Sequence, residues 1–424
     1  MALPPTHPPL FRQRNFSALW WGQLVSLVGE RVTYLALIAL LAAHTQAFHD
    51  ARSSLLLTAL ANVMLAPVLL FAPFAGAWVD RRDLRRVMVS ADLLRACIIL
   101  LVPVLYLFTR SVTPVFVALF LLFTCGVFFL PAKSAFTPEI IAAPQLLTAN
   151  TWLTAAGIAA AAVGSLGGGW LIDHRGWTSA LYLNGATYLV SVAALLLIRH
   201  TPAPRHPDAH APTLRGYLQQ LRAGFHIVRT NPRVGLALST LATVWFAGGF
   251  LHVAGNLQLQ RAVSVPGMAR LGVLMAVLGV GSAVSAGWLN TAGRSLPRPR
   301  VLAAGLVLAG LGLLLFAATT RFEMFVTAAF LMGVAAAPAL MVTETLLQEG
   351  TDLRTRGRVF SLRDFAMRLA FQVAIWIAAL MTPLVGRGAT LIVAAALVSL
   401  AGVLSMLWGR RAPELMGSRP AQGA

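Results

Sequence analysis

Apolar runs of about 20 residues recur along the whole chain, separated by short gaps that hold Arg, Pro and Gly. A helix of that length crosses the ~30 Å hydrocarbon core of a bilayer. The runs between these breaks predict twelve membrane-spanning helices. Their centres lie near Leu27, Pro67, Ile98, Leu122, Ala159, Val190, Trp245, Leu278, Leu308, Gly333, Val373 and Ala396. The pattern therefore predicts an all-α, multi-pass membrane protein.

Composition agrees with this class. Hydrophobic residues make up 58% of the 424 residues and charged residues only 11%, whereas soluble domains are about a quarter charged. Cys97 and Cys125 lie inside apolar runs without metal-ligand spacing. The first run, about Ala18 to Ala43, is longer than the apolar core of a signal peptide, so we expect a retained helix.

The arginines predict the orientation. The formal net charge is +19, and the arginines lie in the gaps between apolar runs. With a cytoplasmic N-terminus, most inner gaps carry more positive charge than any outer gap, which agrees with the positive-inside rule. We therefore expect both termini in the cytoplasm (N-in/C-in) and a bacterial inner (plasma) membrane location. Positive charge that is held at the cytoplasmic face during membrane insertion explains the arginines. We therefore do not expect nucleic acid as a partner.

The same breaks predict five segments. These are a cytoplasmic tail (1–17), a six-helix half (18–198), a cytoplasmic central loop (199–232), a second six-helix half (233–409) and a cytoplasmic tail (410–424). Within the loop, one helical face is apolar: Leu214, Tyr217, Leu218, Leu221 and Phe225. This face indicates a surface helix at the level of the lipid headgroups, and a solvated linker is the alternative.

A charged stretch follows the second run. Gly76, Asp80, Arg81, Arg85 and Arg86 lie in it, and residues 287–294 carry a weaker copy in which Thr291 replaces the acid. This stretch resembles the loop between the second and third helices of major facilitator superfamily transporters.

Further blocks resemble one branch of that superfamily, which contains enterobactin-exporter-like and macrolide-efflux-like proteins. They are residues 11–16, Gly29-Glu30, 131–139, 145–150, 348–349 and 354–361. The resemblance implies the major facilitator fold, with twelve helices in two six-helix halves, and efflux by alternating access. Residues 164–169 resemble the glycine-rich antiporter motif with Ser165 in place of its proline; plain helix packing is the alternative.

An ionisable side chain at bilayer depth costs free energy on membrane insertion, so its presence there indicates a structural or functional role. Glu30, near the middle of the first span, is the best candidate for proton coupling or recognition of a cationic substrate, because a desolvated carboxylate can load a proton near neutral pH. A buried pair with an arginine elsewhere is the alternative. Asp92–Arg95 and Asp364–Arg368 have the spacing of local ion pairs.

Three sets of site residues follow. A mostly apolar central cavity is expected to include Trp20, Trp21, Gln23, Tyr34 and Trp245. The proton-coupling and substrate residues are Glu30, Arg31, Asp92, Trp152, Asn184, His252, Asn256 and Trp376. The conformational gate comprises Gly76, Asp80, Arg81, Arg85, Arg86, Glu344, Arg356, Arg358 and Asp364. Gly76 is expected to permit a close helix crossing, and Asp80 to make a contact that closes the cytoplasmic side.

The sequence therefore predicts a monomeric secondary transporter, most simply a proton-coupled antiporter that exports a small amphipathic compound such as a drug or siderophore. Alternatives are a lipid or lysophospholipid translocator of the same fold, and a non-transporting receptor or scaffold. The sequence holds no phosphate-binding loop, metal-ligand cluster or nucleophile–base pair, so we expect neither an enzyme nor a cofactor. Expected partners are the substrate, protons and membrane lipids.

Overall fold

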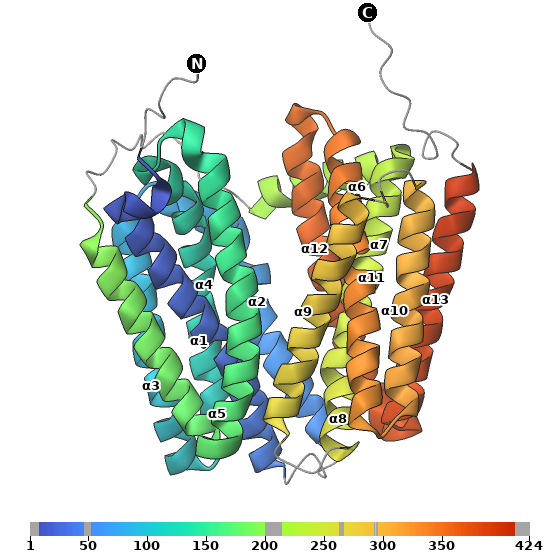
Figure 1. Cartoon of the computed structure of the whole chain (residues 1–424), viewed down its shortest axis with the longest axis horizontal. Coiled ribbons are helices and arrows are strands. Elements are labelled where there is room, and N and C mark those ends of the chain that lie inside the picture. Colours follow the sequence, from blue (N-terminus) through green and yellow to red (C-terminus); the bar gives the residue numbers. More distant parts are fainter. Residues whose placement is uncertain are drawn as a thin grey trace, which may run out of the picture. The chain divides into compact units, whose positions relative to one another are not determined.

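The computed structural model describes residues 8–45, 52–199, 214–262, 267–291, 293 and 296–411, and they form helices joined by short turns. The helices are α1 (Arg14–His44), α2 (Ser53–Val79), α3 (Leu84–Thr109), α4 (Thr113–Ile140), α5 (Leu146–Leu197), α6 (Leu214–Thr230), α7 (Pro232–Phe250), α8 (Asn256–Ala262), α9 (Met268–Asn290), α10 (Arg298–Ala318), α11 (Phe322–Glu349), α12 (Leu353–Val385) and α13 (Arg387–Arg411). Short 3-10 turns, η1 (Leu10–Arg12) and η2 (Ala143–Gln145), precede α1 and α5, and a π turn, η3 (Leu251–Gly255), joins α7 to α8 (Figure 1).

Within the described residues, eleven helical segments are long and apolar enough to cross a membrane. One of them runs from Ala143 to Leu197 and contains a non-helical residue, Gly176, with φ 79° and ψ 165°. Glycine adopts this left-handed region readily, so the chain turns there and α5 supplies two spans. Every predicted centre lies in a helix. The prediction of an all-helical, multi-span protein is therefore confirmed, although α1 begins at Arg14 rather than Ala18.

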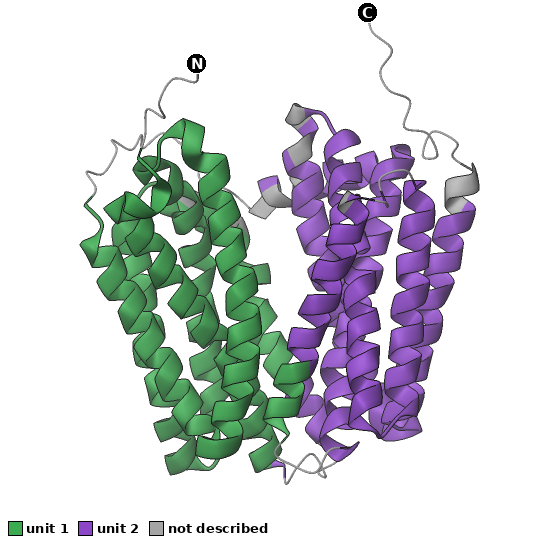
Figure 2. Cartoon of the chain, viewed as in Figure 1, with its two compact units in different colours: residues 1–44, 59–214, 266–273 green, residues 45–58, 215–265, 274–424 purple. Residues whose placement is uncertain are grey.

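The chain divides into two compact units. Unit 1 comprises residues 1–44, 59–214 and 266–273, and unit 2 comprises residues 45–58, 215–265 and 274–424 (Figure 2). In unit 1, α1 packs along α5, and α3 packs against α4 and α5. In unit 2, α7 packs against α11 and α12, while α10 packs against α11 and α13. Both cores are apolar and rich in Ala, Leu and Val.

The contact between α1 and α5 depends on small residues. A Cβ at Gly164 would lie 2.8 Å from the carbonyl oxygen of Val28, and one at Gly168 would lie 3.1 Å from Val32 Cα. The glycine-rich stretch in the fifth span therefore brings two backbones together, which is the helix-packing interpretation of its sequence. Gly167, between them, has open space.

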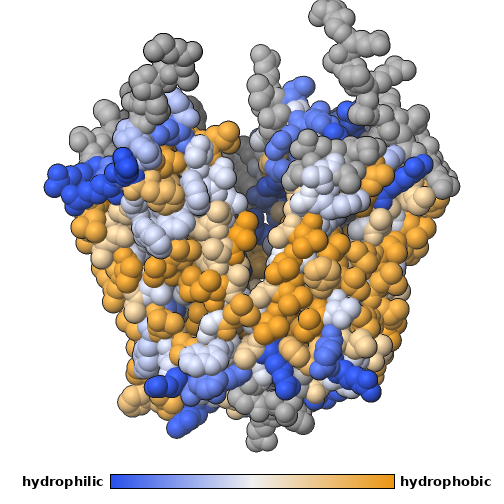
Figure 3. Space-filling view, viewed as in Figure 1, coloured by the Kyte–Doolittle hydropathy of each residue, from blue (hydrophilic) through white to orange (hydrophobic). Residues whose placement is uncertain are grey.

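The outer surfaces suit a lipid environment. On the face shown in Figure 3, hydrophobic residues cover the middle of the helices, and hydrophilic residues gather towards the helix ends. Large apolar side chains such as Phe108, Leu130 and Leu380 are well exposed. Exposure of this kind is normal where the surrounding solvent is hydrocarbon.

A helix, α6, is present where a surface helix is predicted, but its apolar residues do not share one environment. Leu221 is buried against α12, whereas Leu218 and Phe225 are exposed. The side chains of Leu214 and Tyr217 lie outside the described set, as do residues 200–213 of the predicted loop.

Candidate functional site

A cluster of three charged residues lies inside unit 1, and we call it the Arg95 cluster. Arg95 Nη1 of α3 donates to Asp92 Oδ1 at 2.9 Å, and Arg95 Nη2 donates to Glu30 Oε1 of α1. The Asp92 side chain is fully buried, that of Arg95 is 7% exposed and that of Glu30 is 38% exposed. The cluster thus has a buried end at Asp92 and an accessible end at Glu30.

Aromatic rings from two other helices hold the guanidinium. Arg95 Cζ lies 4.3 Å from the ring centroid of Tyr188 in α5 and 5.5 Å from that of Phe129 in α4. Both distances suit cation–π contact, which is strongest where water is excluded. Four helices therefore fix the position of this one arginine.

The predicted Asp92–Arg95 pair is confirmed, and the alternative proposed for Glu30, a pair with an arginine elsewhere, is what the structure shows. Arg31 does not take part in this described pairing. It is exposed, and its Cβ lies 2.8 Å from the Cβ position of Gly164, where α1 crosses α5.

Two further predicted residues of unit 1 have structural contacts. Asn184 is fully buried, and its Nδ2 donates to Thr33 Oγ1 at 2.6 Å, so it joins α5 to α1 rather than lining an open cavity. Trp152 is partly exposed, and its carbonyl accepts a hydrogen bond from Trp20 Nε1 at 2.8 Å. Its ring also meets Phe11 at 5.1 Å, so it helps to fix the segment before α1.

Unit 1 also contains a contact that the sequence analysis missed. The Asp173 carboxylate, near the Gly176 turn, accepts the backbone N–H groups of Met268 at 3.0 Å and Ala269 at 2.9 Å. These are the first two residues of α9, and a carboxylate at a helix N-terminus is stabilising. Asp173 is followed by His174 and Arg175, as in an ordinary polar loop, so the sequence alone does not predict that it caps the start of α9.

In unit 2, His252 and Asn256 are buried next to the π turn. His252 Nε2 lies 3.1 Å from the carbonyl oxygen of Leu57, and because a carbonyl only accepts, this nitrogen carries the hydrogen. Asn256 Nδ2 donates to the His252 carbonyl at 2.6 Å. Trp376 of α12 is half-exposed. Single-turn π segments inside helices occur frequently at functional sites. No sequence pattern predicts this one.

A second charged cluster lies where α11 and α12 meet, and we call it the Arg363 cluster. Arg363 Nη1 donates to Glu344 Oε2 at 2.6 Å, and Arg363 Nη2 lies 2.8 Å from Asp364 Oδ1. The expected partner of Asp364 was Arg368, so that assignment is wrong. Helical spacing favoured Arg368, whereas the adjacent Arg363 bends back to reach both carboxylates. Arg358 is exposed, and the side chain of Arg356 lies outside the described set.

The charged stretch after α2 has contacts different from those expected. A Cβ at Gly76 would meet no atom within 4 Å, so the prediction that Gly76 permits a close helix crossing is wrong. Arg85 donates from Nε to Leu195 O at 2.8 Å and from Nη2 to Leu196 O at 2.6 Å, which satisfies carbonyls at the end of α5. Arg86 pairs with Asp83, the residue that caps the start of α3.

The outermost residues of this stretch are exposed. Asp80 and Arg81 lie in the turn after α2. The role of Asp80 in closing the cytoplasmic side stays a prediction.

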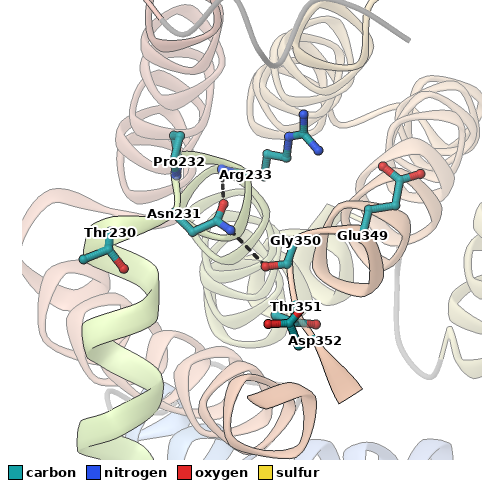
Figure 4. Close-up of a pocket in the computed structure, with 8 residues that line it drawn as sticks. All are labelled: Thr230, Asn231, Pro232, Arg233, Glu349, Gly350, Thr351 and Asp352. Carbon is teal, nitrogen blue, oxygen red and sulfur yellow. Dashed lines mark hydrogen bonds between the residues drawn. The ribbon is translucent and has the colours of Figure 1, made fainter. Parts of the chain in front are cut away.

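A cavity of about 400 Å³ lies at the end of unit 2 where α7 and α12 begin (Figure 4). It is lined by Thr230, Asn231, Pro232, Arg233, Glu349, Gly350, Thr351 and Asp352. Asn231 crosses it, accepting from Arg233 N at 3.0 Å and donating to Gly350 O at 2.9 Å. The first bond caps α7, and the second ties the α6–α7 turn to the α11–α12 turn. In the described part of the chain, no three His, Cys, Asp or Glu side chains converge as a metal site would require.

The fold and the buried charges inside spanning helices define a membrane transporter, and the chain belongs to the Major Facilitator Superfamily, whose model matches residues 19–296. It is similar to the putative bacilysin exporter BacE of Bacillus subtilis, with 26% identity over 85% of this chain and 86% of that protein. It is also similar to macrolide efflux protein A of Streptococcus pyogenes, with 24% identity over 88% of this chain and 90% of that protein.

Solved structures agree on the fold. A bacterial homologue of the human lysosomal transporter Spinster, inward-facing and unoccupied, has a TM-score of 0.73 with 13% identity, covering 98% of this chain and 100% of that one. A POT family transporter in complex with a thioalcohol-conjugated peptide has a TM-score of 0.71 with 12% identity, covering 95% and 97%. The expected superfamily and its transport class are thereby confirmed, and the protein is a multi-span transporter of the bacterial plasma membrane.

Proposed function

We propose that this protein exports a small amphipathic compound in exchange for protons, by alternating access. The curated relatives include an exporter and an efflux protein that match most of its length, which supports outward transport. The single structural observation that carries the proton part is the Arg95 cluster, an ionic group inside spanning helices. Buried charge in a membrane is costly and is retained where it serves transport.

The composition of the Arg95 cluster supports proton exchange at Glu30. Two carboxylates share one guanidinium, so the cluster carries one excess negative charge when both acids are ionised. One proton would neutralise these three residues; Lys133 of α4, which interacts electrostatically with both carboxylates, offsets part of their charge when they are ionised. Asp92 is sealed from solvent, whereas Glu30 is accessible, so Glu30 is the group that exchanges the proton and Asp92 fixes Arg95. The surrounding rings of Tyr188 and Phe129 keep Arg95 in place whether Glu30 is protonated or ionised.

The remaining parts of this proposal follow from the sequence. Both termini lie in the cytoplasm, the protein works as a monomer, and no cofactor takes part. The Arg363 cluster and Asp80, in the charged stretch after α2, contribute to closing the cytoplasmic side. His252, Asn256 and Trp376 in unit 2 contribute to substrate contact.

Proteoliposomes with an imposed proton gradient test the proposal. Substrate movement is measured for bacilysin, a macrolide and a lysophospholipid, together with the internal pH. Glu30→Gln should remove gradient-driven movement and leave folding intact, whereas Glu323→Gln, at an exposed position in α11, should behave as the native chain. Unchanged coupling in Glu30→Gln would remove this residue from the mechanism. If only the lysophospholipid moves, the protein is a lipid translocator and not an exporter of another amphipathic compound.

A further inference from the structure

Helix α6 has an exposed face that combines apolar and basic side chains. Leu218, Arg222, Phe225 and Arg229 recur at intervals of three or four residues, so they share one side of the helix. All four are exposed, Leu218 at 54% and Phe225 at 55%. We call this set the α6 outer face.

The neighbouring side of α6 packs against α12. Leu221 is buried in the cluster that contains Val359 and Leu362. A Cβ on Gly224 would lie 2.8 Å from the carbonyl oxygen of Arg358 and 3.2 Å from Leu362 Cβ, so the two backbones are in contact. The α6 outer face is therefore presented in a defined direction from unit 2, rather than on a free helix.

The position of α6 places it at the bilayer surface. It ends at Thr230, and the spanning helix α7 begins at Pro232, with only Asn231 between them. Figure 1 shows α6 at the end of unit 2 where α7 and α12 begin. Headgroups lie at this level when α7 spans the membrane.

The chemistry of the α6 outer face distinguishes possible partners. Residues 214–230 contain Arg215, Arg222 and Arg229 and no Asp or Glu. A soluble polyanion would engage the arginines but leave Leu218 and Phe225 in water. An anionic lipid surface satisfies both, because guanidinium groups bind phosphates while Leu and Phe enter the acyl boundary.

We propose that the α6 outer face binds anionic phospholipid headgroups of the leaflet next to the start of α7, and that this binding stabilises α6 on α12. Lipid bound to α6 then also stabilises α12, which carries Arg363. The proposal concerns a surface separate from the Arg95 cluster and does not depend on the cargo or on proton coupling.

Hydrogen exchange of the full chain in bilayer discs tests the proposal. Amide exchange in peptides covering 214–230 is compared in phosphatidylcholine and in a phosphatidylcholine–phosphatidylglycerol mixture. Each arginine near an anionic surface raises the equilibrium constant for lipid binding about fivefold. Phosphatidylglycerol should slow α6 exchange, and Arg222→Gln with Arg229→Gln should reduce that slowing by about 25-fold. Arg175→Gln with Arg321→Gln, which removes two exposed arginines elsewhere, should leave it intact.

Other outcomes would overturn the proposal. Exchange that is equal in the two lipids, or slowed equally in the Arg222/Arg229 variant, would exclude lipid binding by this face. Inorganic phosphate added to phosphatidylcholine discs should have no effect; equal protection by phosphate would identify a soluble-anion site. Leu218→Ser with Phe225→Ser should also weaken the lipid effect, and an unchanged effect would contradict the apolar part of the proposal. None of these measurements uses transport, so failure here is separate from failure of the export mechanism.

Discussion

Arg95 contacts two carboxylates and two aromatic rings through one guanidinium. Its two acidic partners differ in burial, and burial decides how much each one matters for stability. Loss of Asp92 takes an acceptor from Arg95 at a place that water does not reach, whereas water can replace the accessible Glu30.

We therefore expect Asp92→Asn to be more destabilising than Glu30→Gln. The first should cost about 1–3 kcal/mol, the usual penalty when a buried group loses its hydrogen-bond partner. The second should cost about 1 kcal/mol or less, because water reaches Glu30. Denaturation midpoints of the purified variants in one detergent measure the difference. Equal losses would mean that the two carboxylates hold Arg95 equally.

The sequence could predict only part of this cluster. Asp92 and Arg95 are three residues apart on one helix, so their pairing is a local property. Glu30 is 65 residues from Arg95, and their contact exists because α1 and α3 are held together in unit 1. The hydrogen bond of Asn184 could not be predicted for a similar reason. A buried polar residue looks the same in sequence whether it meets a ligand or a neighbouring helix, here Thr33 of α1.

At the scale of elements, α1 and α5 meet through glycines whose Cβ positions are already occupied by the other helix. Gly164 and Gly167 lie three residues apart in α5, yet one faces the α1 backbone and the other faces open space. They form a matched pair for measuring the strength of the helix contact.

Gly164→Ala should destabilise the protein by about 1–3 kcal/mol, the usual cost of overpacking, because backbone atoms of Val28 cannot move aside easily. Gly167→Ala should be neutral or slightly stabilising, since Ala favours a helix over Gly. Thermal unfolding of both variants in detergent tests this expectation. Similar losses for the two would show that helix flexibility, rather than close approach, is the reason for the glycines.

Asp173 makes a testable contact between elements at the start of α9. Asp173→Ala should lower local stability there by about 1 kcal/mol, the typical value of a side-chain cap. Amides of Met268 and Ala269 should exchange several-fold faster, because each loses its acceptor. Asp352→Ala is the control, since Asp352 precedes α12 without a side-chain capping bond. Unchanged exchange at Met268 would show that the N–H groups find another acceptor.

Elements were predictable where the hydrophobic pattern was long, and less so where a single residue decides the geometry. All twelve apolar runs form helix. The turn at Gly176 follows the polar residues that separate the fifth and sixth predicted spans, whereas the π turn at Leu251–Gly255 lies inside an apolar run and no local sequence signal marks it. The path of Arg85 to the end of α5 was equally hidden, because it joins segments 110 residues apart.

At the scale of the whole molecule, family membership and spanning helices are established, and the orientation of the chain remains a prediction from its arginines. Single cysteines test this orientation in a background where Cys97 and Cys125 are replaced by Ser. Arg175→Cys and Arg321→Cys should react with a membrane-impermeant maleimide in intact cells. Arg86→Cys and Arg222→Cys should react only after permeabilisation. The reverse pattern would place both termini outside.

The turn at Gly176 has a mechanical consequence for the fifth and sixth spans. One non-helical residue joins them, so no spare length of chain lies between their adjoining ends. A tilt of one span must therefore carry the near end of the other with it, while their far ends can separate or approach. The pair acts as a hairpin that converts a small change of angle at one membrane surface into a larger displacement at the other.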